Sequence, residues 1–210
     1  MGWKIFDISF NQYDRWFDVD GRIIFRNELK ALQMISAEKS SKSIEIGSGT
    51  GRFTEALNID FGIEPSFNMA HISKQRGVKS IVAKGESLPI KNNVFKTAFF
   101  IFSICFIDNL DKVLNEVHRI LQKKGEIIIG FIPSESTLGK QYIQKKRENH
   151  PYYRYSAFFS YEELKTALLE KKFKIVDAVF HLLSDEKTLE HPIQGIDPKA
   201  NFLIIKAVKE

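Results

Sequence analysis

Short apolar runs alternate along this chain with longer segments in which apolar residues recur at helical spacing. Five runs rich in β-branched and aromatic residues predict strands at residues 43–46, 60–63, 80–83, 97–102 and 126–131. Between the last two runs, residues 110–121 place Leu110, Val113, Leu114, Val117 and Leu121 on one helical face. This alternation predicts βαβ units and a parallel sheet.

Helices are predicted in three further segments, residues 22–38, 65–76 and 161–171. The second begins at Pro65, whose fixed φ suits a first helical turn, and Gly77 follows it as a stop signal. Ser160 and Glu163 have the spacing of a capping box in front of the third. The segment 133–159 shows no regular pattern.

Two late apolar runs predict strands at residues 173–180 and 201–208, with no good helix between them. Without a crossover helix the two strands are expected to be antiparallel and to close the end of the sheet. The chain is therefore expected to form one α/β domain over residues 1–210, in which residues 1–40 make an N-terminal helical cap.

The glycine-rich segment after the first predicted strand is the most informative motif. It reads Glu45-Ile46-Gly47-Ser48-Gly49-Thr50-Gly51-Arg52-Phe53, and an acid, Glu64, closes the next strand 17 positions after Gly47. Glycine allows a sharp turn and lets backbone N–H groups approach a ligand closely. This layout is typical of a nucleotide-type cofactor site, with a glycine loop for the middle of the ligand and a carboxylate for ribose hydroxyls.

The last two residues of the motif disfavour two classes of glycine loop. A P-loop requires lysine and a hydroxyl residue after its last glycine, whereas Gly51 is followed by Arg52 and Phe53. A dinucleotide-binding loop requires a third glycine where this chain has Arg52, so an NAD-linked oxidoreductase is disfavoured.

Taken together, these residues resemble the class I S-adenosylmethionine-dependent methyltransferases, above all the small single-domain group that includes ubiquinone and menaquinone biosynthesis methyltransferases. The resemblance covers residues 43–131. It rests on five motifs in order: the glycine loop, Glu64-Pro65-Ser66, Gly85-Glu86-Ser87-Leu88-Pro89, the strand 98–102 with Ser103, and the passage from Glu116 to Ile129. It implies a Rossmann-like, seven-stranded, mostly parallel sheet with an antiparallel closing strand and helices on both faces.

The resemblance also implies S-adenosylmethionine as cofactor, with S-adenosylhomocysteine as product. The cofactor-binding residues that it implies are Glu45, Gly47, Ser48, Gly49, Gly51, Glu64, Pro65, Ser66, Met69, Gly85, Glu86, Phe102 and Ser103. Among these, Glu64 is expected to accept two ribose hydroxyls, and Glu45 the ammonium of the methionine part. Ser66 and Met69 are expected to flank the adenine.

Polar and aromatic residues supply the candidates for acceptor binding. They are Tyr13, Trp16, Phe131, Tyr142, His150 and Tyr152. In similar proteins a Tyr-Asp element, here Tyr13-Asp14, lies over the cofactor as a lid. Residues 133–160 follow the fifth predicted strand, where such enzymes place substrate-contacting insertions. Trp16 has an alternative reading as a core aromatic, and His150 as part of an exposed turn.

The chain departs from the family pattern at residue 84, and this departure supports an alternative function. The family usually has Asp in front of the Gly85 motif, where it contacts the adenine amino group, and this chain has Lys84. The leading expectation is methyl transfer to a small-molecule acceptor. The alternative is a non-catalytic S-adenosylmethionine-binding regulatory module, since no general base can be identified and the catalytic residues stay unknown.

Composition and charge disfavour several classes of binding partner. The net charge is +5, but lysines are spread along the chain and often lie beside acids, so nucleic-acid binding is disfavoured. No apolar run is long enough for a membrane span, and the five histidines lack metal-ligand spacing, so neither a membrane nor a metal is expected. One cysteine, Cys105, favours a reducing cytoplasm. We expect a monomer or a homodimer.

Overall fold

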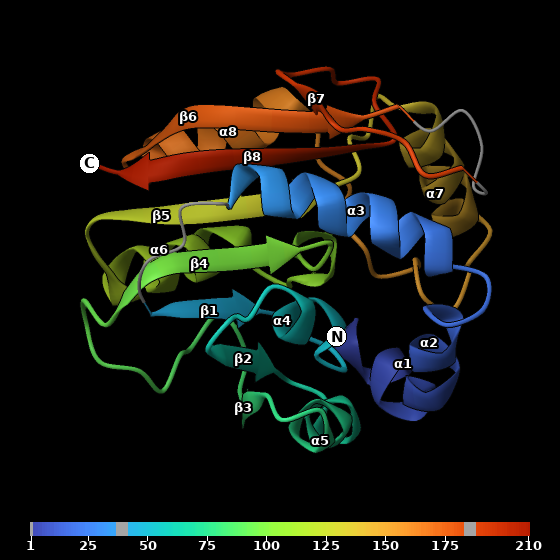
Figure 1. The fold of residues 1–210 in the computed structure, drawn as a ribbon, viewed down its shortest axis with the longest axis horizontal. Helices are drawn as coiled ribbons and strands as arrows, with labels where there is room; N and C mark the ends of the chain where they lie inside the picture. The colour runs from blue at the N-terminus through green and yellow to red at the C-terminus, as the bar shows by residue number, and fades with distance from the viewer. Residues whose placement is uncertain (1, 37–41, 183–187) are drawn as a thin grey trace.

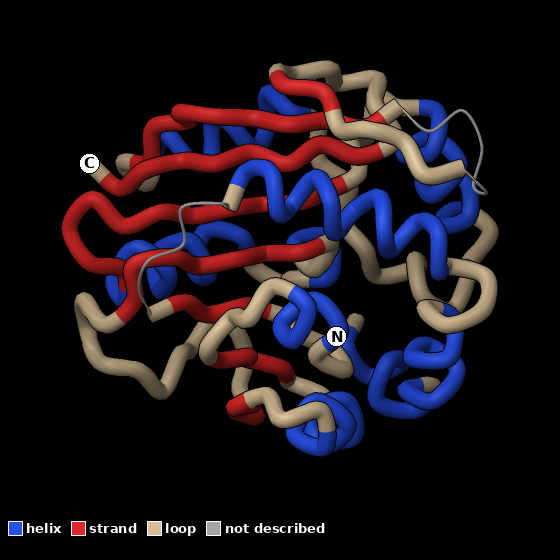
Figure 2. Tube along the Cα trace, in the orientation of Figure 1, coloured by secondary structure: helices blue, strands red, loops and turns tan. Residues whose placement is uncertain are grey.

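A computed structural model describes residues 2–36, 42–182 and 188–210. In this part of the chain one sheet has the strand order β3-β2-β1-β4-β5-β8-β6-β7 (Figures 1 and 2). Its strands are β1 (Ser43–Ile46), β2 (Phe61–Glu64), β3 (Lys79–Val82), β4 (Phe95–Ile101), β5 (Leu121–Phe131), β6 (Phe173–His181), β7 (Ile193–Gln194) and β8 (Phe202–Lys209). The pairs from β3 to β5 are parallel, and β8 is antiparallel to both of its neighbours.

This arrangement confirms the predicted Rossmann-like α/β fold and the antiparallel closing pair. The sheet has one strand more than the seven expected. The extra strand, β7, pairs with the outer edge of β6 through Val179 and Phe180. Two residues are too few to show the alternation by which a strand is predicted from sequence.

The helices are α1 (Trp3–Ile8), α2 (Phe10–Trp16), α3 (Arg22–Ile35), α4 (Arg52–Ala56), α5 (Phe67–Gln75), α6 (Leu110–Ile120), α7 (Thr137–Arg147) and α8 (Tyr161–Glu170), with a 3-10 turn η1 at Ile104–Phe106. Residues 37 and 38 of the helix predicted at 22–38 lie outside the described residues. The helix predicted from Pro65 starts later, because Ser66 is its N-cap and accepts from Met69 N at 3.1 Å. No pattern predicted α7, since Gly139 is the only residue that it buries.

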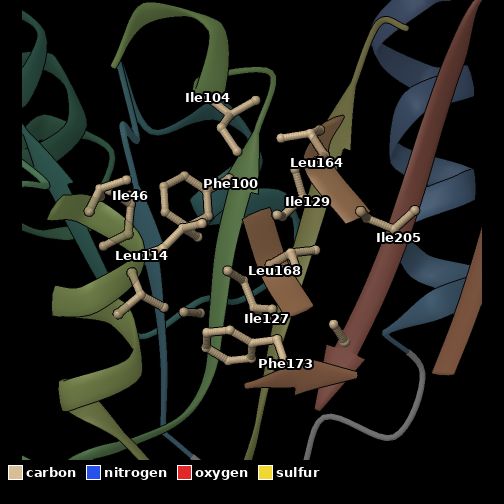
Figure 3. Packing of buried hydrophobic residues seen from close by; sticks show 14 of the residues in the cluster. Ile46, Phe100, Ile104, Leu114, Ile127, Ile129, Leu164, Leu168, Phe173 and Ile205 are labelled. Atoms are coloured by element: carbon tan, nitrogen blue, oxygen red, sulfur yellow. The ribbon is translucent and has the colours of Figure 1, made fainter. Parts of the chain in front are cut away.

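The sheet separates two hydrophobic clusters, because successive side chains of a strand point to opposite faces. In β4, Ala98 and Phe100 belong to the cluster under α6 and α8, whereas Phe99 and Ile101 belong to the cluster under α3. Figure 3 shows Phe100 packed with Leu114 of α6 and near Leu164 of α8. The central strands are therefore buried on both faces, which holds their ends in place.

The carboxyl ends of the parallel strands meet at one edge of the sheet. In Figure 1, β1 and β4 point toward the side of the molecule where α1, α2 and α7 lie. Ligands of open α/β sheets bind at this edge. No helix in the described part of the chain is long and apolar enough to cross a bilayer.

Candidate functional site

The glycine loop turns the chain sharply between β1 and α4. Gly47, Gly49 and Gly51 have φ values of +76°, +53° and +84°, in the left-handed region that glycine adopts without strain. A Cβ on Gly47 would lie 2.5 Å from Cβ of Ser103, so a side chain there would collide with the segment after β4. The loop is thus shaped for close approach between backbones.

Glu64 ends β2 beside this loop, and its carboxylate is held by two backbone donors. Its Oε2 accepts from Gly49 N at 2.9 Å, and its Oε1 accepts from Ser66 N at 2.9 Å. The side chain is buried, and burial raises its pKa to about 7 against the lowering effect of the two bonds. Each oxygen keeps a free lone pair, so the carboxylate offers two oriented acceptors.

A cavity of about 100 Å³, the loop cavity, lies over the glycine loop. The predicted cofactor-binding residues that line it are Gly47, Gly49, Glu64, Pro65, Met69, Gly85, Glu86, Phe102 and Ser103. The remaining four, Glu45, Ser48, Gly51 and Ser66, do not line it. The structure therefore brings most of the predicted set together around one space.

Three of the other four form hydrogen bonds around the cavity without lining it. Glu45 is buried and accepts from Thr54 Oγ1 at 2.5 Å, so its carboxylate faces α4 and not the cavity. Burial raises the pKa of Glu45 to about 8. Ser66 caps α5 and donates to Asp7 Oδ1 at 2.6 Å. Ser48 Oγ donates to the carbonyl of Ile63 at 3.4 Å.

Sequence reasoning missed Trp3, which also lines the loop cavity. Its indole Nε1 is buried without a hydrogen-bond partner among the described residues. Lys84 lines the same cavity and lies 3.4 Å from Asp108 Oδ2. The cavity thus combines two carboxylate acceptors at Glu64 with an indole donor and an ammonium, a set that suits a ribonucleoside. Only the N-terminal packing brings Trp3 here, and no local pattern marks it.

The N-terminal helices close over the loop through two acidic anchors. Asp7 of α1 accepts from Ser66 Oγ and from Asn68 N at 3.1 Å. Asp14 of α2 accepts from Arg52 at 2.8 Å and from Arg76 at 2.9 Å. Between these anchors, the Tyr13 ring lies 3.8 Å from the place that a Cβ on Gly49 would take.

A second cavity of about 300 Å³, the aromatic cavity, adjoins the first. Five residues line both: Phe6, Tyr13, Ile101, Phe102 and Phe106. Of the predicted acceptor residues, those that line it are Tyr13, Trp16, Phe131, Tyr142 and Tyr152. His150 does not line it, and its ring stacks on Tyr153 with centroids 5.0 Å apart. No Lys, Arg or His lines it in the described part of the chain.

Phe102 stands at the junction of the two cavities in a strained conformation. Its φ is +52°, which a residue with a large side chain rarely adopts. The backbone N of Phe102 donates to the carbonyl of Gly130 at 2.9 Å, which fixes the turn after β4. Strain of this kind costs on the order of 1–3 kcal/mol and concentrates at functional sites.

Gln12 and Glu28 also line the aromatic cavity and were not predicted. Glu28 lies on α3, and its spacing from Phe25, Leu32 and Ile35 places it on the apolar face of that helix. An acid in an apolar stripe is a signal that could have singled it out. Burial raises its pKa well above the usual range.

Comparison with known proteins agrees with this geometry. A family model described as a methyltransferase domain matches residues 44–129. The chain is 39% identical over 177 residues to an uncharacterized protein of Methanocaldococcus jannaschii, covering 83% of each chain. It is 30% identical over 203 residues to an uncharacterized protein of Mycobacterium tuberculosis, covering 94% of this chain and 71% of the other. A crystal structure from Thermotoga maritima, of an S-adenosylmethionine-dependent methyltransferase described as a possible histamine N-methyltransferase, superimposes over 100% of both chains with TM-score 0.92 and 35% identity.

Proposed function

The chain belongs to the S-adenosylmethionine-dependent methyltransferases, and from this premise we propose that it methylates a small molecule bound in the aromatic cavity. S-adenosylmethionine is its cofactor and S-adenosylhomocysteine its product. The observation that carries the proposal is that the loop cavity and the aromatic cavity meet at Tyr13 and Phe102. A donor on one side of this junction and an acceptor on the other would be in contact.

For the cofactor, we assign the ribose hydroxyls to the two free acceptors of Glu64. The glycine loop takes the methionine part, since Gly47 and Gly49 line the cavity without side chains. Met69 and the backbone at Gly85 surround the adenine. Trp3 Nε1 and Lys84 offer donors to the ring nitrogens, in place of the acid that the family usually has at residue 84.

When bound, S-adenosylmethionine supplies a methyl group that is already activated on a sulfonium. The chain therefore accelerates transfer mainly by orienting the acceptor and excluding water. Asp7 and Asp14 hold α1 and α2 over the loop, which excludes water from above. The rings of Tyr13 and Phe102 lie at the junction, where cation–π attraction would stabilise a sulfonium by about 0.5–2 kcal/mol.

For the acceptor, the aromatic cavity supports a small molecule with an apolar body. Its volume of about 300 Å³ lies at the lower end of ligand pockets, and aromatic side chains form most of its wall. Because no basic residue in the described part of the chain lines it, a nucleic-acid strand would find no phosphate contacts there. We propose a monomer or homodimer that acts on this molecule in the cytoplasm.

The test is the formation of S-adenosylhomocysteine by purified protein with S-adenosylmethionine and a panel of small amines, phenols and thiols, measured by mass spectrometry. We expect release that depends on an acceptor, its loss in Glu64→Ala, and its retention in the exposed control Glu170→Gln. Binding of the cofactor without turnover on any acceptor would favour the regulatory alternative. Absence of binding at millimolar cofactor would overturn the cofactor assignment.

A further inference from the structure

Glu28 is a buried acid that has no partner among the described residues. It lies on α3 with 8% of its surface exposed and lines the aromatic cavity. Among the described residues, none forms a hydrogen bond or an ion pair with its carboxylate. The buried residues beside it on α3 are mostly apolar, among them Ala31, Leu32 and Ile35.

A partnerless buried carboxylate is costly to the folded protein. Burying an ionised carboxylate without a compensating charge costs several kcal/mol, and even the neutral acid loses hydrogen bonds to water. Leucine at this position of α3 would avoid the cost. Because no partner in the described part of the chain accounts for Glu28, its role is best sought in what enters the cavity.

The rest of the cavity wall indicates the charge of that ligand. No Lys, Arg or His in the described chain lines the cavity, although the protein as a whole carries a net charge of +5. An anionic acceptor would therefore meet the carboxylate of Glu28 with nothing to offset it. A cation would meet that carboxylate together with the negative faces of rings such as Trp16, Phe17 and Tyr152.

We propose that Glu28 binds a protonated nitrogen of the acceptor, so that the acceptor class is a small basic amine with an apolar body. For transfer to this nitrogen, its N–H proton passes to the Glu28 carboxylate, the freed lone pair forms the bond to the methyl carbon, and the carbon–sulfur bond breaks to leave S-adenosylhomocysteine. This inference rests on the proposed function and adds to it the residue that selects the substrate. Tyr13 supports it, because it lines the same cavity and its hydroxyl also makes no hydrogen bond within the described residues. Glu28 and Tyr13 would then receive the polar end of the ligand while the rings hold its body.

Matched pairs of probes test this inference on the protein saturated with S-adenosylhomocysteine. The pairs are 2-phenylethylamine with 2-phenylethanol, and tryptamine with indole-3-ethanol, each titrated by calorimetry. The amines are expected to bind about tenfold or more tightly than the alcohols, as a charge-assisted hydrogen bond implies. Since burial favours the protonated acid in the empty cavity, amine binding should also release protons, visible as a buffer-dependent heat.

The variant Glu28→Gln keeps the size of the side chain and removes its charge. It should lose the preference for amines, while Glu170→Gln, an exposed glutamate on α8, should keep it. Alcohol binding that is unchanged in Glu28→Gln would show that the cavity is still folded. Equal affinity for amines and alcohols in the unmodified protein, no amine binding at all, or an unchanged preference in Glu28→Gln would overturn the inference.

The acceptor panel separates this inference from the proposed function. If Glu28→Gln methylates phenols or thiols as fast as the unmodified protein does and amines are never methylated, Glu28 has no role in acceptor choice and the methyltransferase proposal stands. If no acceptor is methylated at all while amines still bind through Glu28, the proposed function fails and the amine site remains.

Discussion

The guanidinium of Arg52 lies 2.8 Å from the carboxylate of Asp14, which joins helix α2 to the first residue of α4 directly after the glycine loop. Arg76 donates to the same carboxylate at 2.9 Å. Partial burial opposes ionisation of Asp14, but hydrogen bonds from Arg52 and Arg76 outweigh it and hold the pKa at about 2. The Asp14 carboxylate is therefore ionised at neutral pH and pairs with both guanidinium groups.

Asp14→Asn should weaken binding of S-adenosylmethionine. Asparagine keeps the shape of the side chain but leaves two guanidinium groups without their shared counter-charge, which loosens α2 over the loop. We expect a loss on the order of 1–2 kcal/mol, or roughly 5- to 30-fold in Kd, by calorimetry. Asp18→Asn is the control, because Asp18 is exposed and its side chain pairs, among the described residues, with Arg52 alone. A loss as large in the control as in Asp14→Asn would contradict the role of Asp14 in holding α2 over the loop.

Glu64 should make cofactor binding dependent on pH. Its pKa of about 7 results from burial, and ribose hydroxyls donate best to the ionised carboxylate. The affinity for S-adenosylmethionine should therefore fall as pH drops below 7, by up to about tenfold per pH unit, and level off above it. Glu64→Gln should bind about 1–3 kcal/mol more weakly and lose this part of the pH dependence. If the affinity of Glu64→Gln for S-adenosylmethionine changed with pH as that of the unmodified protein does, the assignment of Glu64 to the ribose hydroxyls would be contradicted.

The helices and strands that could be predicted are those whose buried face gives a regular pattern of apolar residues in the sequence. Strand β4 and helix α6 differ from their predicted ranges by at most two residues at either end, because their apolar residues are dense and regularly spaced. Helix α7 left no pattern, since it buries only Gly139. The helices α1 and α2 are short and bury little, so their positions depend on anchors such as Asp7 and Asp14.

The candidate site likewise contains residues that could be predicted from the sequence and residues that could not. The glycine loop and Glu64 could be predicted, because a left-handed turn after a strand admits few residues other than glycine and the acid follows at a fixed place on β2. Trp3 and Glu28 reach the two cavities only through packing of the N-terminal helices against the sheet. Contacts between residues far apart in sequence leave no local pattern, so only the position of Glu28 within an apolar helical stripe could have marked one of the two.

Gly51→Ala should destabilise the protein more than Gly77→Ala. Both glycines have positive φ, +84° and +87°, so alanine is strained at each. At Gly51 the added Cβ would also lie 2.6 Å from Ser73 Oγ, whereas at Gly77 nothing lies within 4 Å. The backbone contribution cancels in the comparison, and we expect an additional loss of about 1–3 kcal/mol at Gly51 by chemical denaturation. Equal losses would show that the loop can shift to accept a side chain.

Glu45 should make the stability of the cofactor-free protein fall as pH rises. Burial in the first place, and the charge of Glu64 in addition, raise its pKa to about 8, against a hydrogen bond from Thr54. Below the ordinary carboxyl pKa of about 4.5, both the folded and the unfolded protein hold this proton, and Glu45 contributes no pH dependence. Between about 4.5 and 8 only the folded protein holds it, so rising pH favours unfolding.

Glu45→Gln removes this titration and keeps an acceptor oxygen for Thr54. The free energy of unfolding should therefore drop less between pH 5 and pH 8 in the variant than in the unmodified protein, with a difference on the order of 4 kcal/mol. Glu64, with its pKa of about 7, still lowers the stability of both proteins over part of this range. The exposed variant Glu170→Gln should follow the unmodified protein. Denaturation curves measured at each pH check the prediction, and Glu45→Gln curves that shift with pH as much as those of the unmodified protein would show that Glu45 is ionised in the folded state.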